Sequence, residues 1–354
     1  MNAPERGATK PIRVNLFSDT QTRPTEAMRN VMAEAEVGDE QLGEDPTVNL
    51  LQDMVAEMLG KEASVFLPSG TMCNEISFAV HCRPGDEIVM HETAHPLTAE
   101  GGGPAALTGA LIRSLSGERG IFSAGALEAA IRPPSRYSAR TRAVSIEQTT
   151  NIAGGAIWPL DTMHEVCTVA RAHGLVPHLD GARLFNAVVA TGISAADYAA
   201  SFESAWIDLS KGLGAPVGAV LTGTADFIDE AWRFKQRMGG AMRQAGIIAA
   251  AGVYALRHHL HGLEQDHANA ATLARGLADL PGIALDPDLV ETNIVIFDVA
   301  GTKMTADEFA ARMLDDHGVR YSTIGPTSVR AVTHLDVSRE DVEIALEGAR
   351  TVLR

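Results

Sequence analysis

The strongest constraint on the fold is the alternation of short apolar runs with longer amphipathic stretches between Glu62 and Gly223. Apolar runs of strand length lie at Ala63–Leu67, Glu87–His91, Ala110–Leu115, Arg142–Glu147, Val176–Asp180, Trp206–Leu209 and Ala219–Thr222. Helical patterns lie between several of these runs, at Thr71–His81, Ala124–Ile131 and Leu160–His173. This alternation predicts an α/β fold in which helices cover a mostly parallel sheet. Such sheets bind their ligands at the carboxyl ends of the strands.

The segments on either side of this block have a different pattern. Before it, Asp45 and Pro46 are suited to the N-cap and first position of a helix, which we expect to continue to about Leu59. After it, a long helical region runs from Met242 to about Leu277. Its glycines are expected to bend or break that helix.

Past Pro281 the chain mixes short strand patterns with helical ones. We expect strands at Ile283–Leu285, Asn293–Asp298, Val319–Ser322 and Ser328–Thr333, and helices at Thr305–His317 and Ser338–Leu353. Ser338 and Asp341 have the spacing of a capping box. The sequence therefore predicts an N-terminal arm and helix (1–45), a large domain (46–255) and a small C-terminal α+β domain (256–354).

The composition excludes several classes of partner. A formal net charge of −16 argues against nucleic acid and against anionic membranes, because both need basic patches. The three cysteines are too few and too scattered for a disulfide framework or a zinc site, so we expect no metal. Residues 1–10 lack the apolar core of a signal peptide, and no apolar stretch is long enough to span a bilayer. We therefore expect a cytoplasmic protein.

Lys211 and Asp180 each stand at the end of an apolar run of strand length. The chain has only five lysines, and Lys211 alone has this placement. Partial desolvation at a strand end makes an amine more reactive. A lysine and an aspartate at strand ends are what pyridoxal 5′-phosphate (PLP) requires, since the lysine forms a Schiff base and the aspartate keeps the pyridine nitrogen protonated. The large domain is therefore predicted to bind PLP.

Three further groups of residues are candidates for the same site. Ser69-Gly70-Thr71 follows a strand and opens a helix, a junction whose free N–H groups suit a phosphate, although a plain turn would look the same. Arg183 follows Asp180 closely and suits a carboxylate or the cofactor's phenolic oxygen, unless it only pairs with a surface acid. His95 lies just past a strand end, where it could stack on the cofactor or act as a base, with His91 as the competitor.

Two other patterns give weaker signals. The segment Gly212 to Gly218 is a poor match to a dinucleotide loop, because Pro216 interrupts it and no suitable helix follows. His258, His259 and His261 are neighbours on a helical stretch, where adjacent side chains point apart and a chance cluster is favoured over a metal site. An oxidoreductase and a metal enzyme are therefore disfavoured.

With these residues assembled, the chain resembles the threonine aldolase and β-eliminating lyase family of fold-type I PLP enzymes. The resemblance begins near Leu16 and continues to the C-terminus. The motifs that carry it are Ser18-Asp19-Thr20, Gly43-Glu44-Asp45-Pro46, Pro68-Ser69-Gly70-Thr71, Asp180-Gly181-Ala182-Arg183, Leu209-Ser210-Lys211-Gly212-Leu213, Gly239-Gly240-Ala241-Met242-Arg243-Gln244-Ala245-Gly246 and Val332-Thr333-His334. Many motifs in one order make this resemblance specific.

The resemblance implies a role for each matching residue. Lys211 would carry the Schiff base, Asp180 would pair with the pyridine nitrogen, and His95 would stack on the ring. Gly70 and Thr71, with Ser69, would hold the phosphate. The substrate carboxylate would be bound by Ser18, Arg183 and Arg330. The family also implies a homotetramer, a dimer of dimers with active sites between subunits, to which the segment from Arg237 to Arg243 would contribute.

The chain departs from the family pattern at several positions. Leu42 stands where the family usually has tyrosine, and Tyr137 stands where it usually has histidine, which makes Tyr137 a candidate substrate-binding residue. The family's Glu-Asn-Thr-His-Asn reads Glu147-Gln148-Thr149-Thr150-Asn151. We expect these changes to lie on the substrate side. They therefore suggest a substrate larger than threonine or different from it.

The resemblance predicts an aldolase that cleaves a β-hydroxy-α-amino acid, such as L-threonine, L-allo-threonine or a bulkier analogue, to glycine and an aldehyde. His95, or a water that it orders, is the candidate base. The nearest alternatives on this scaffold are a β-eliminating lyase and an amino-acid racemase. A PLP-fold protein without catalysis is disfavoured because Lys211, Asp180 and Arg183 are all present.

Overall fold

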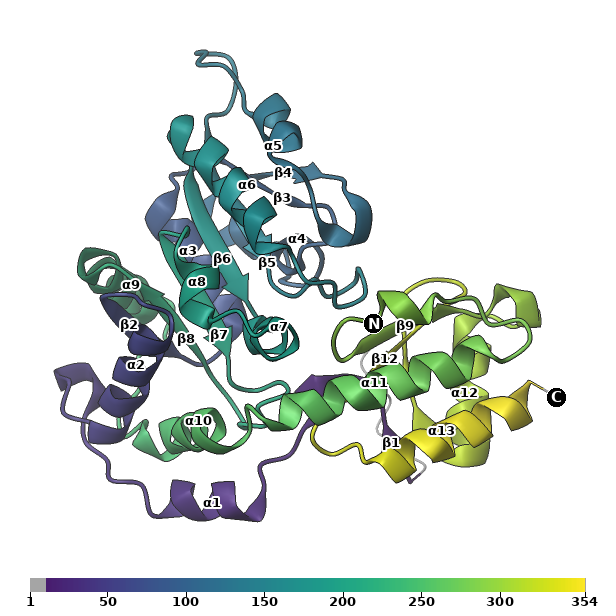
Figure 1. Ribbon diagram of the computed structural model, residues 1–354. Coiled ribbons are helices and arrows are strands. Elements are labelled where there is room, and N and C mark those ends of the chain that lie inside the picture. The colour runs from purple at the N-terminus through teal and green to yellow at the C-terminus, as the bar shows by residue number, and fades with distance from the viewer. Residues whose placement is uncertain (1–10, 354) are drawn as a thin grey trace. The chain divides into compact units, whose positions relative to one another are not determined.

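The computed structural model describes residues 11–353, which divide into two units (Figure 1). The larger unit is Thr22–Glu264, and the smaller consists of the described residues up to Gln21 together with those from Gln265 onward. The helix α1 (Glu26–Ala33) therefore belongs to the larger unit. The domain boundaries expected after residues 45 and 255 stay a prediction.

A seven-stranded sheet runs through the larger unit. Its strands in spatial order are β2 (Ala63–Leu67), β8 (Ala219–Gly223), β7 (Ser204–Asp208), β6 (Val176–Gly181), β5 (Thr141–Glu147), β3 (Glu87–His91) and β4 (Leu111–Leu115). From β7 to β4 all neighbours are parallel, whereas β8 is antiparallel to both β7 and β2. The predicted mostly parallel sheet is confirmed, and each expected apolar run overlaps one of its strands, with bounds that differ by up to two residues.

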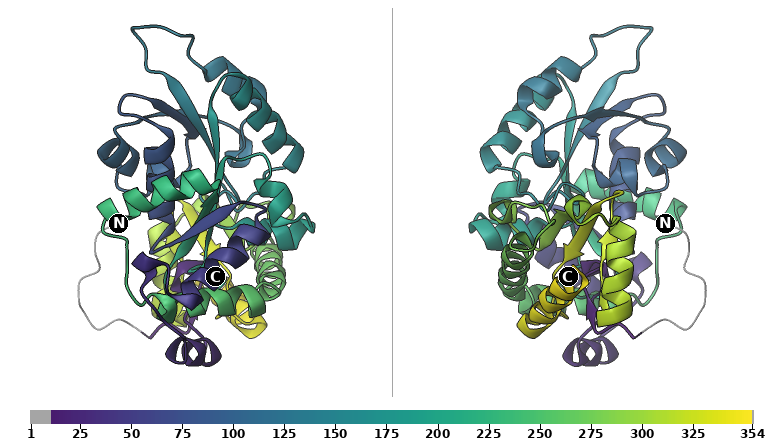
Figure 2. Two further views of the ribbon diagram at one scale, coloured as in Figure 1. Left: turned by 90° about the vertical axis from the view of Figure 1, so that its left-hand side faces the viewer. Right: turned by 90° about the vertical axis from the view of Figure 1, so that its right-hand side faces the viewer.

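Helices cover both faces of this sheet (Figure 2). One face is covered by α2 (Pro46–Met58), α5 (Ala124–Ala130), α6 (Leu160–Ala172), α7 (Leu184–Thr191), α8 (Ala195–Ala199) and α10 (Gly246–His258), and the other by α3 (Gly70–His81) and α9 (Ala225–Arg237). Strand residues alternate between the two cores, as a period of two requires. In β2, Phe66 packs into the first core, whereas Val65 and Leu67 pack into the second.

The local signals in the sequence work as expected. The carboxylate of Asp45 accepts hydrogen bonds from the N–H groups of Thr47 and Val48 at 3.1 and 3.0 Å and so caps α2. The long helical region breaks after His258, and α11 (Gly262–Ala278) begins at Gly262. None of the helices in residues 11–353 has the length and hydropathy that crossing a bilayer requires.

The strand directions bring several loop segments to one edge of the sheet. Because β2 is antiparallel to β8 and β8 is antiparallel to β7, β2 points the same way as the parallel strands. The carboxyl ends of β2, β3, β5, β6 and β7 therefore all lie at the same edge. The predicted residues Ser69, His95, Asp180 and Lys211 lie at or just after these ends, where α/β sheets bind ligands.

The smaller unit contains an antiparallel sheet of β9 (Ile294–Asp298), β12 (Ser328–Val332) and β11 (Ser322–Thr323), with helices α12 (Ala306–His317) and α13 (Arg339–Val352). A parallel pair joins β1 (Val14–Asn15) to β10 (Val319–Arg320). The predicted capping box of α13 is present.

Two strand predictions in this unit are wrong. The expected strand Val319–Ser322 is split between two sheets. The break falls at Tyr321, whose buried ring packs against Phe297 and Phe309. The expected strand Ile283–Leu285 makes only one bridge, from Ala284 to Asp298, because it lies between a left-handed glycine and a proline-initiated turn.

Candidate active site

Lys211 lies in the loop that follows β7. Its Nζ donates a hydrogen bond to Oδ2 of Asp208 at 2.8 Å, and Oδ1 of Asp208 accepts from the N–H and hydroxyl of Ser210 at 2.7 and 2.9 Å. The hydroxyl of Thr22 donates to the carbonyl of Lys211 at 2.9 Å and fixes the loop. The Lys211 side chain is 17% exposed. The amine is thus held in one place and still reachable from solvent.

Asp180 is buried at the carboxyl end of β6, beside β7 in the sheet. Its carboxylate accepts hydrogen bonds from Nδ2 of Asn74 at 2.9 Å and from the N–H of Ala182 at 3.0 Å. Burial raises the pKa of Asp180, and it outweighs the Asn74 hydrogen bond and the positive charge of Lys211, which both lower it. A further positive charge beside Asp180 would therefore be favourable, because it would stabilise the buried carboxylate.

His95 opens the short helix α4 (His95–Thr98), just past the carboxyl end of β3. Its Nδ1 lies 2.7 Å from Oε1 of Glu100. Burial lowers the pKa of His95, but the Glu100 hydrogen bond and the charges of Asp180 and Glu100 outweigh it and raise the pKa. In His91 both ring nitrogens have loop partners, Thr93 and the carbonyl of Gly117. His95 is therefore the histidine available to a ligand.

The N-terminus of α3 lies at the same edge, after β2. Ser69 caps the helix by accepting a hydrogen bond from the N–H of Met72 at 3.2 Å. The N–H groups of Gly70 and Thr71 precede the first bond of the helix, so they and the helix dipole suit an anion. A side chain at Gly70 would collide with the ring of Trp206, 2.3 Å from the added carbon. Glycine is thus required here by close packing.

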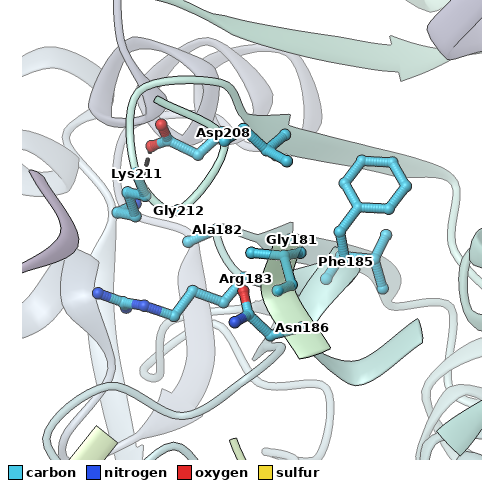
Figure 3. A pocket seen from close by; sticks show the side chains of 11 residues that line it. Gly181, Ala182, Arg183, Phe185, Asn186, Asp208, Lys211 and Gly212 are labelled. Atoms are coloured by element: carbon cyan, nitrogen blue, oxygen red, sulfur yellow. Dashed lines mark hydrogen bonds and ion pairs between the residues drawn. The ribbon is translucent and has the colours of Figure 1, made fainter. Parts of the chain in front are cut away.

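Arg183 and Lys211 line one pocket, together with Gly181, Asn186 and Asp208. Figure 3 shows the Lys211–Asp208 pair on one side of this pocket and Arg183 with Asn186 on the other. Arg183 is buried at the N-cap position of α7, where its side chain makes no capping hydrogen bond, and its backbone N–H donates to the carbonyl of Gln148 at 3.0 Å. The structure therefore brings the predicted amine and the predicted carboxylate-binding cation to one pocket.

The structure adds four residues that the sequence did not single out. Asn74, Glu100 and Glu147 are buried beside Asp180 or its partners, and Glu75 is buried beside Glu100. Burial, and then the charge of Asp180, raise the pKa of Glu147, while burial, and then the charge of Glu100, raise that of Glu75 to about 8. The available signal concerned Asn74 and Glu75 alone, two adjacent polar residues within a helix that is otherwise mostly apolar.

Two of the departures from the family pattern are structural. Gln148 is buried and exchanges two hydrogen bonds with the backbone of Trp158, at 3.2 and 3.0 Å. The buried hydroxyl of Thr150 accepts from the N–H of Ala156 at 3.0 Å. The expectation that these two side chains lie on the substrate side is therefore wrong, because both hold the loop after β5 together.

The other two departures are exposed. Tyr137 is 94% exposed in the loop that precedes β5. It lies at the amino edge of the sheet, so its own chain does not bring it to Asp180 and Lys211. Leu42 is 70% exposed at the end of the short 3₁₀ turn Glu40–Leu42. The predicted role of Tyr137 in substrate binding stays a prediction.

Ser18 and Arg330 belong to the smaller unit. The hydroxyl of Ser18 accepts hydrogen bonds from the N–H and hydroxyl of Thr20, at 3.2 and 2.9 Å. Arg330 lies in the middle of β12, opposite Ile296 of β9. Their predicted contact with a substrate carboxylate stays a prediction.

These residues fit PLP. A buried carboxylate whose pKa is raised suits a pyridinium N–H, because that contact supplies the missing cation. An anchored lysine amine and a capped helix N-terminus with open N–H groups stand at the same edge of the sheet. Residues 11–353 hold no group of three or more His, Cys, Asp or Glu side chains arranged as metal ligands.

Comparison with known proteins identifies the family of this chain. The family model described as "Beta-eliminating lyase" matches residues 15–301. The low specificity L-threonine aldolase of Escherichia coli K12 is 40% identical, with 93% of this chain and 96% of that protein covered. Low-specificity L-threonine aldolase 1 of Arabidopsis thaliana is 39% identical, with 94% of each covered.

Solved structures show the same fold. A Leishmania major threonine aldolase superposes with a TM-score of 0.83 at 19% identity, covering 96% of this chain and all of that one. Serine palmitoyltransferase of Sphingomonas wittichii superposes with a TM-score of 0.74 at 19% identity, covering 95% and 86%. From the matched family model and the relatives near 40% identity, together with the site described above, the chain belongs to the threonine aldolase and β-eliminating lyase family of fold-type I PLP-dependent enzymes.

Proposed function

We propose that this enzyme is an aldolase that cleaves the Cα–Cβ bond of a β-hydroxy-α-amino acid and releases glycine and an aldehyde. The observation that carries the proposal is the meeting of Lys211, Asp180 and the N-terminus of α3 at one sheet edge. The relatives near 40% identity are threonine aldolases, which supports this reaction over others of the family.

Four residues would hold the cofactor. Lys211 would bind it covalently, and Asp180 would pair with its ring nitrogen. Gly70 and Thr71 would hold the phosphate with their N–H groups, behind the cap that Ser69 provides. When bound, PLP supplies an electron sink for the negative charge that develops at Cα.

Arg183 would bind the substrate carboxylate. It is the buried cation of the pocket that also contains Lys211, and a guanidinium fork matches a carboxylate with two parallel hydrogen bonds. Fixing the carboxylate orients Cα and thereby selects which of its bonds is broken. Sequence resemblance alone supports the same role for Ser18 and Arg330, and for Tyr137 as a further substrate contact.

His95 would take the proton of the β-hydroxyl, directly or through a water. Its Nδ1 is committed to Glu100, so Nε2 is the nitrogen that would accept. Glu100 accepts from both His95 and Asn74, which fixes the imidazole ring. The same ring is the candidate to stack on the cofactor.

A panel of β-hydroxy-α-amino acids, with detection of the aldehyde, tests the proposal. We expect glycine and the matching aldehyde in equal amounts. Pyruvate with ammonia would instead indicate β-elimination, the reaction that the family model's description favours as the alternative, and a D-amino acid would indicate a racemase. Since Gln148 and Thr150 are structural, a preference for bulkier substrates rests on Leu42 and Tyr137 alone. Equal turnover of threonine and all bulkier substrates would remove it.

We further propose a cytoplasmic homotetramer with active sites between subunits. Large apolar side chains are exposed on elements that pack together in the larger unit. Leu42 is 70% exposed, Ile247 of α10 is 48% and Leu50 of α2 is 39%. Apolar surface of this kind is typical of subunit interfaces. Sedimentation of the holoenzyme would measure the assembly, and a monomer would contradict it.

A further inference from the structure

Asn74 is a buried junction of four hydrogen bonds in the second turn of α3. Its Nδ2 donates to Asp180 at 2.9 Å and to Glu100 at 2.9 Å. Its Oδ1 accepts from Nε1 of Trp206 at 2.8 Å and is 3.1 Å from Nε2 of His178. Every hydrogen-bonding position of the amide is thus in use.

Trp206 fixes which way the amide faces. An indole N–H can only donate, so the amide atom beside it must be the oxygen. The amide nitrogen must then face the two carboxylates of Asp180 and Glu100. The reversed amide would place its oxygen against both carboxylates and its N–H₂ against the indole N–H. One tryptophan therefore determines that two donors point at the site.

His178 continues the series of oriented hydrogen bonds from Asn74 to Ser204 in the sheet. Because Oδ1 of Asn74 cannot donate, Nε2 of His178 carries the proton. Burial lowers the pKa of His178 to about 3, so the ring is neutral and its Nδ1 accepts from the hydroxyl of Ser204, 2.8 Å away. The Ser204 hydroxyl has a single proton, which it donates to His178. Nε2 of His81, which lies 2.8 Å from the same hydroxyl oxygen, must therefore be the donor in that contact.

The result is a one-way chain of neutral donors from His81 through Ser204, His178 and Asn74 to Asp180. Its last three members are fully buried or nearly so. In a low-dielectric interior, aligned hydrogen bonds polarise one another and strengthen the final donor. The last bond is the hydrogen bond that opposes the effect of burial on Asp180.

We propose that Asn74, oriented by Trp206 and His178, is the positioning residue that holds the Asp180 carboxylate ionised and aimed at the cofactor's ring nitrogen. It also ties Asp180 to the His95–Glu100 pair, because one amide nitrogen donates to both carboxylates. The inference rests on the proposed pairing of Asp180 with PLP. It adds the residues that make this pairing strong.

The test uses an analogue of PLP in which carbon replaces the ring nitrogen. Apoenzyme is titrated with PLP and with the analogue, and the ratio of the two dissociation constants measures the ring-nitrogen contact alone. Wild-type protein should prefer PLP. In Asn74→Leu, which is similar in size but cannot donate, this preference should fall about tenfold, the difference between a charge-assisted and a neutral hydrogen bond. A loss of packing alone would weaken both cofactors equally and leave the ratio unchanged.

Two companion variants separate the possible outcomes. Asp180→Asn should lose the preference, and if it does not, the proposed function of Asp180 fails. If Asp180→Asn loses the preference and Asn74→Leu keeps it, only the present inference fails. Ser77→Ala is the matched control, because Ser77 is buried in the same helix and its hydroxyl donates to the carbonyl of Cys73 instead. It should leave the ratio unchanged.

A second pair of variants decides the question if Asn74→Leu does not fold. His178→Gln retains a donor for Oδ1 of Asn74, and His178→Leu removes it. We expect His178→Leu to lower the preference for PLP and His178→Gln to keep most of it. Equal ratios in the two variants would overturn the chain of donors.

Discussion

The two edges of the larger sheet treat carboxylates in opposite ways. At the amino edge, Asp86 precedes β3 and accepts two hydrogen bonds from Arg140, at 3.0 and 2.8 Å. Burial raises the pKa of Asp86, but these bonds outweigh it and the pKa lies below its usual value. At the carboxyl edge, burial prevails and the pKa values of Asp180 and Glu147 are raised.

The opposite pKa shifts at the two edges indicate that a cationic group would be stabilised at the carboxyl edge. The acids of the amino edge have arginine partners of their own chain, with Arg132 on Glu87 at 3.0 Å as a second case. At the carboxyl edge, Asp208 has Lys211 as its partner at 2.8 Å, but the charges of Lys211, Arg183 and His95 do not offset the effect of burial on the pKa values of Asp180 and Glu147. A bound pyridinium would correct that imbalance for Asp180. Changes at the carboxyl edge should therefore alter chemistry, and changes at the amino edge should alter little.

The largest effect is expected for Lys211→Ala. Lys211 is the lysine that lines the pocket of Arg183, so the variant should lose both aldehyde release and the visible absorbance of the cofactor's imine. Absorbance spectra of the purified protein with added PLP measure this directly. An unchanged spectrum would contradict the central role of Lys211.

The second largest effect on turnover is expected for His95→Phe. Phenylalanine keeps a ring that can stack on the cofactor but cannot accept a proton. Turnover should fall by roughly 10²–10⁴-fold, the usual contribution of a general base, while PLP stays bound. Steady-state kinetics and the PLP spectrum together check both parts. Wild-type turnover would exclude His95 as the base and leave a water or another group in that role.

The comparison also explains what the sequence can predict. Lys211 and Asp180 are readable because each ends an apolar run, and a strand end is a local property. Glu100 and Glu147 are not readable in this way, and the polar pair Asn74-Glu75 marks a position in α3 without identifying its partners. The contacts of these residues with Asp180 or its partners form only after the strand order places α3, β3 and β5 around β6. The expectation that Gln148 and Thr150 lie on the substrate side was wrong for a related reason. Their partners, Trp158 and Ala156, become visible only when the loop after β5 is folded.

Glu75→Gln should have an effect on stability that depends on pH. A carboxyl whose pKa is raised in the folded state, here from 4.5 to about 8, binds its proton more tightly folded than unfolded. Its contribution to stability is therefore favourable at low pH and is lost as the pH rises from the unfolded value toward the folded one. Glutamine cannot ionise and removes this loss.

Thermal unfolding of the two proteins between about pH 5 and about pH 8 provides the measurement. The wild type should lose stability relative to Glu75→Gln across this range, by roughly a few kcal/mol if the whole shift is expressed. The effect belongs to Glu75 because it is buried beside Glu100, without an arginine of the kind that Asp86 has. Parallel curves for the two proteins would show that Glu75 ionises as freely in the folded protein as in the unfolded chain.

The smallest effect is expected for Arg140→Ala at the amino edge. The arginine side chain is 59% exposed, and exposed ion pairs contribute little because water and salt screen them. Asp86 keeps the hydrogen bond from the N–H of Arg83 at 2.8 Å, so its carboxylate is not left without a donor. Turnover and the melting temperature should stay close to those of the wild type. A large loss of turnover with normal stability would instead indicate that the loop of Arg140 and Tyr137 reaches the active site of another subunit. The difference between the amino and carboxyl edges of the sheet would then hold for one chain but not for the assembly.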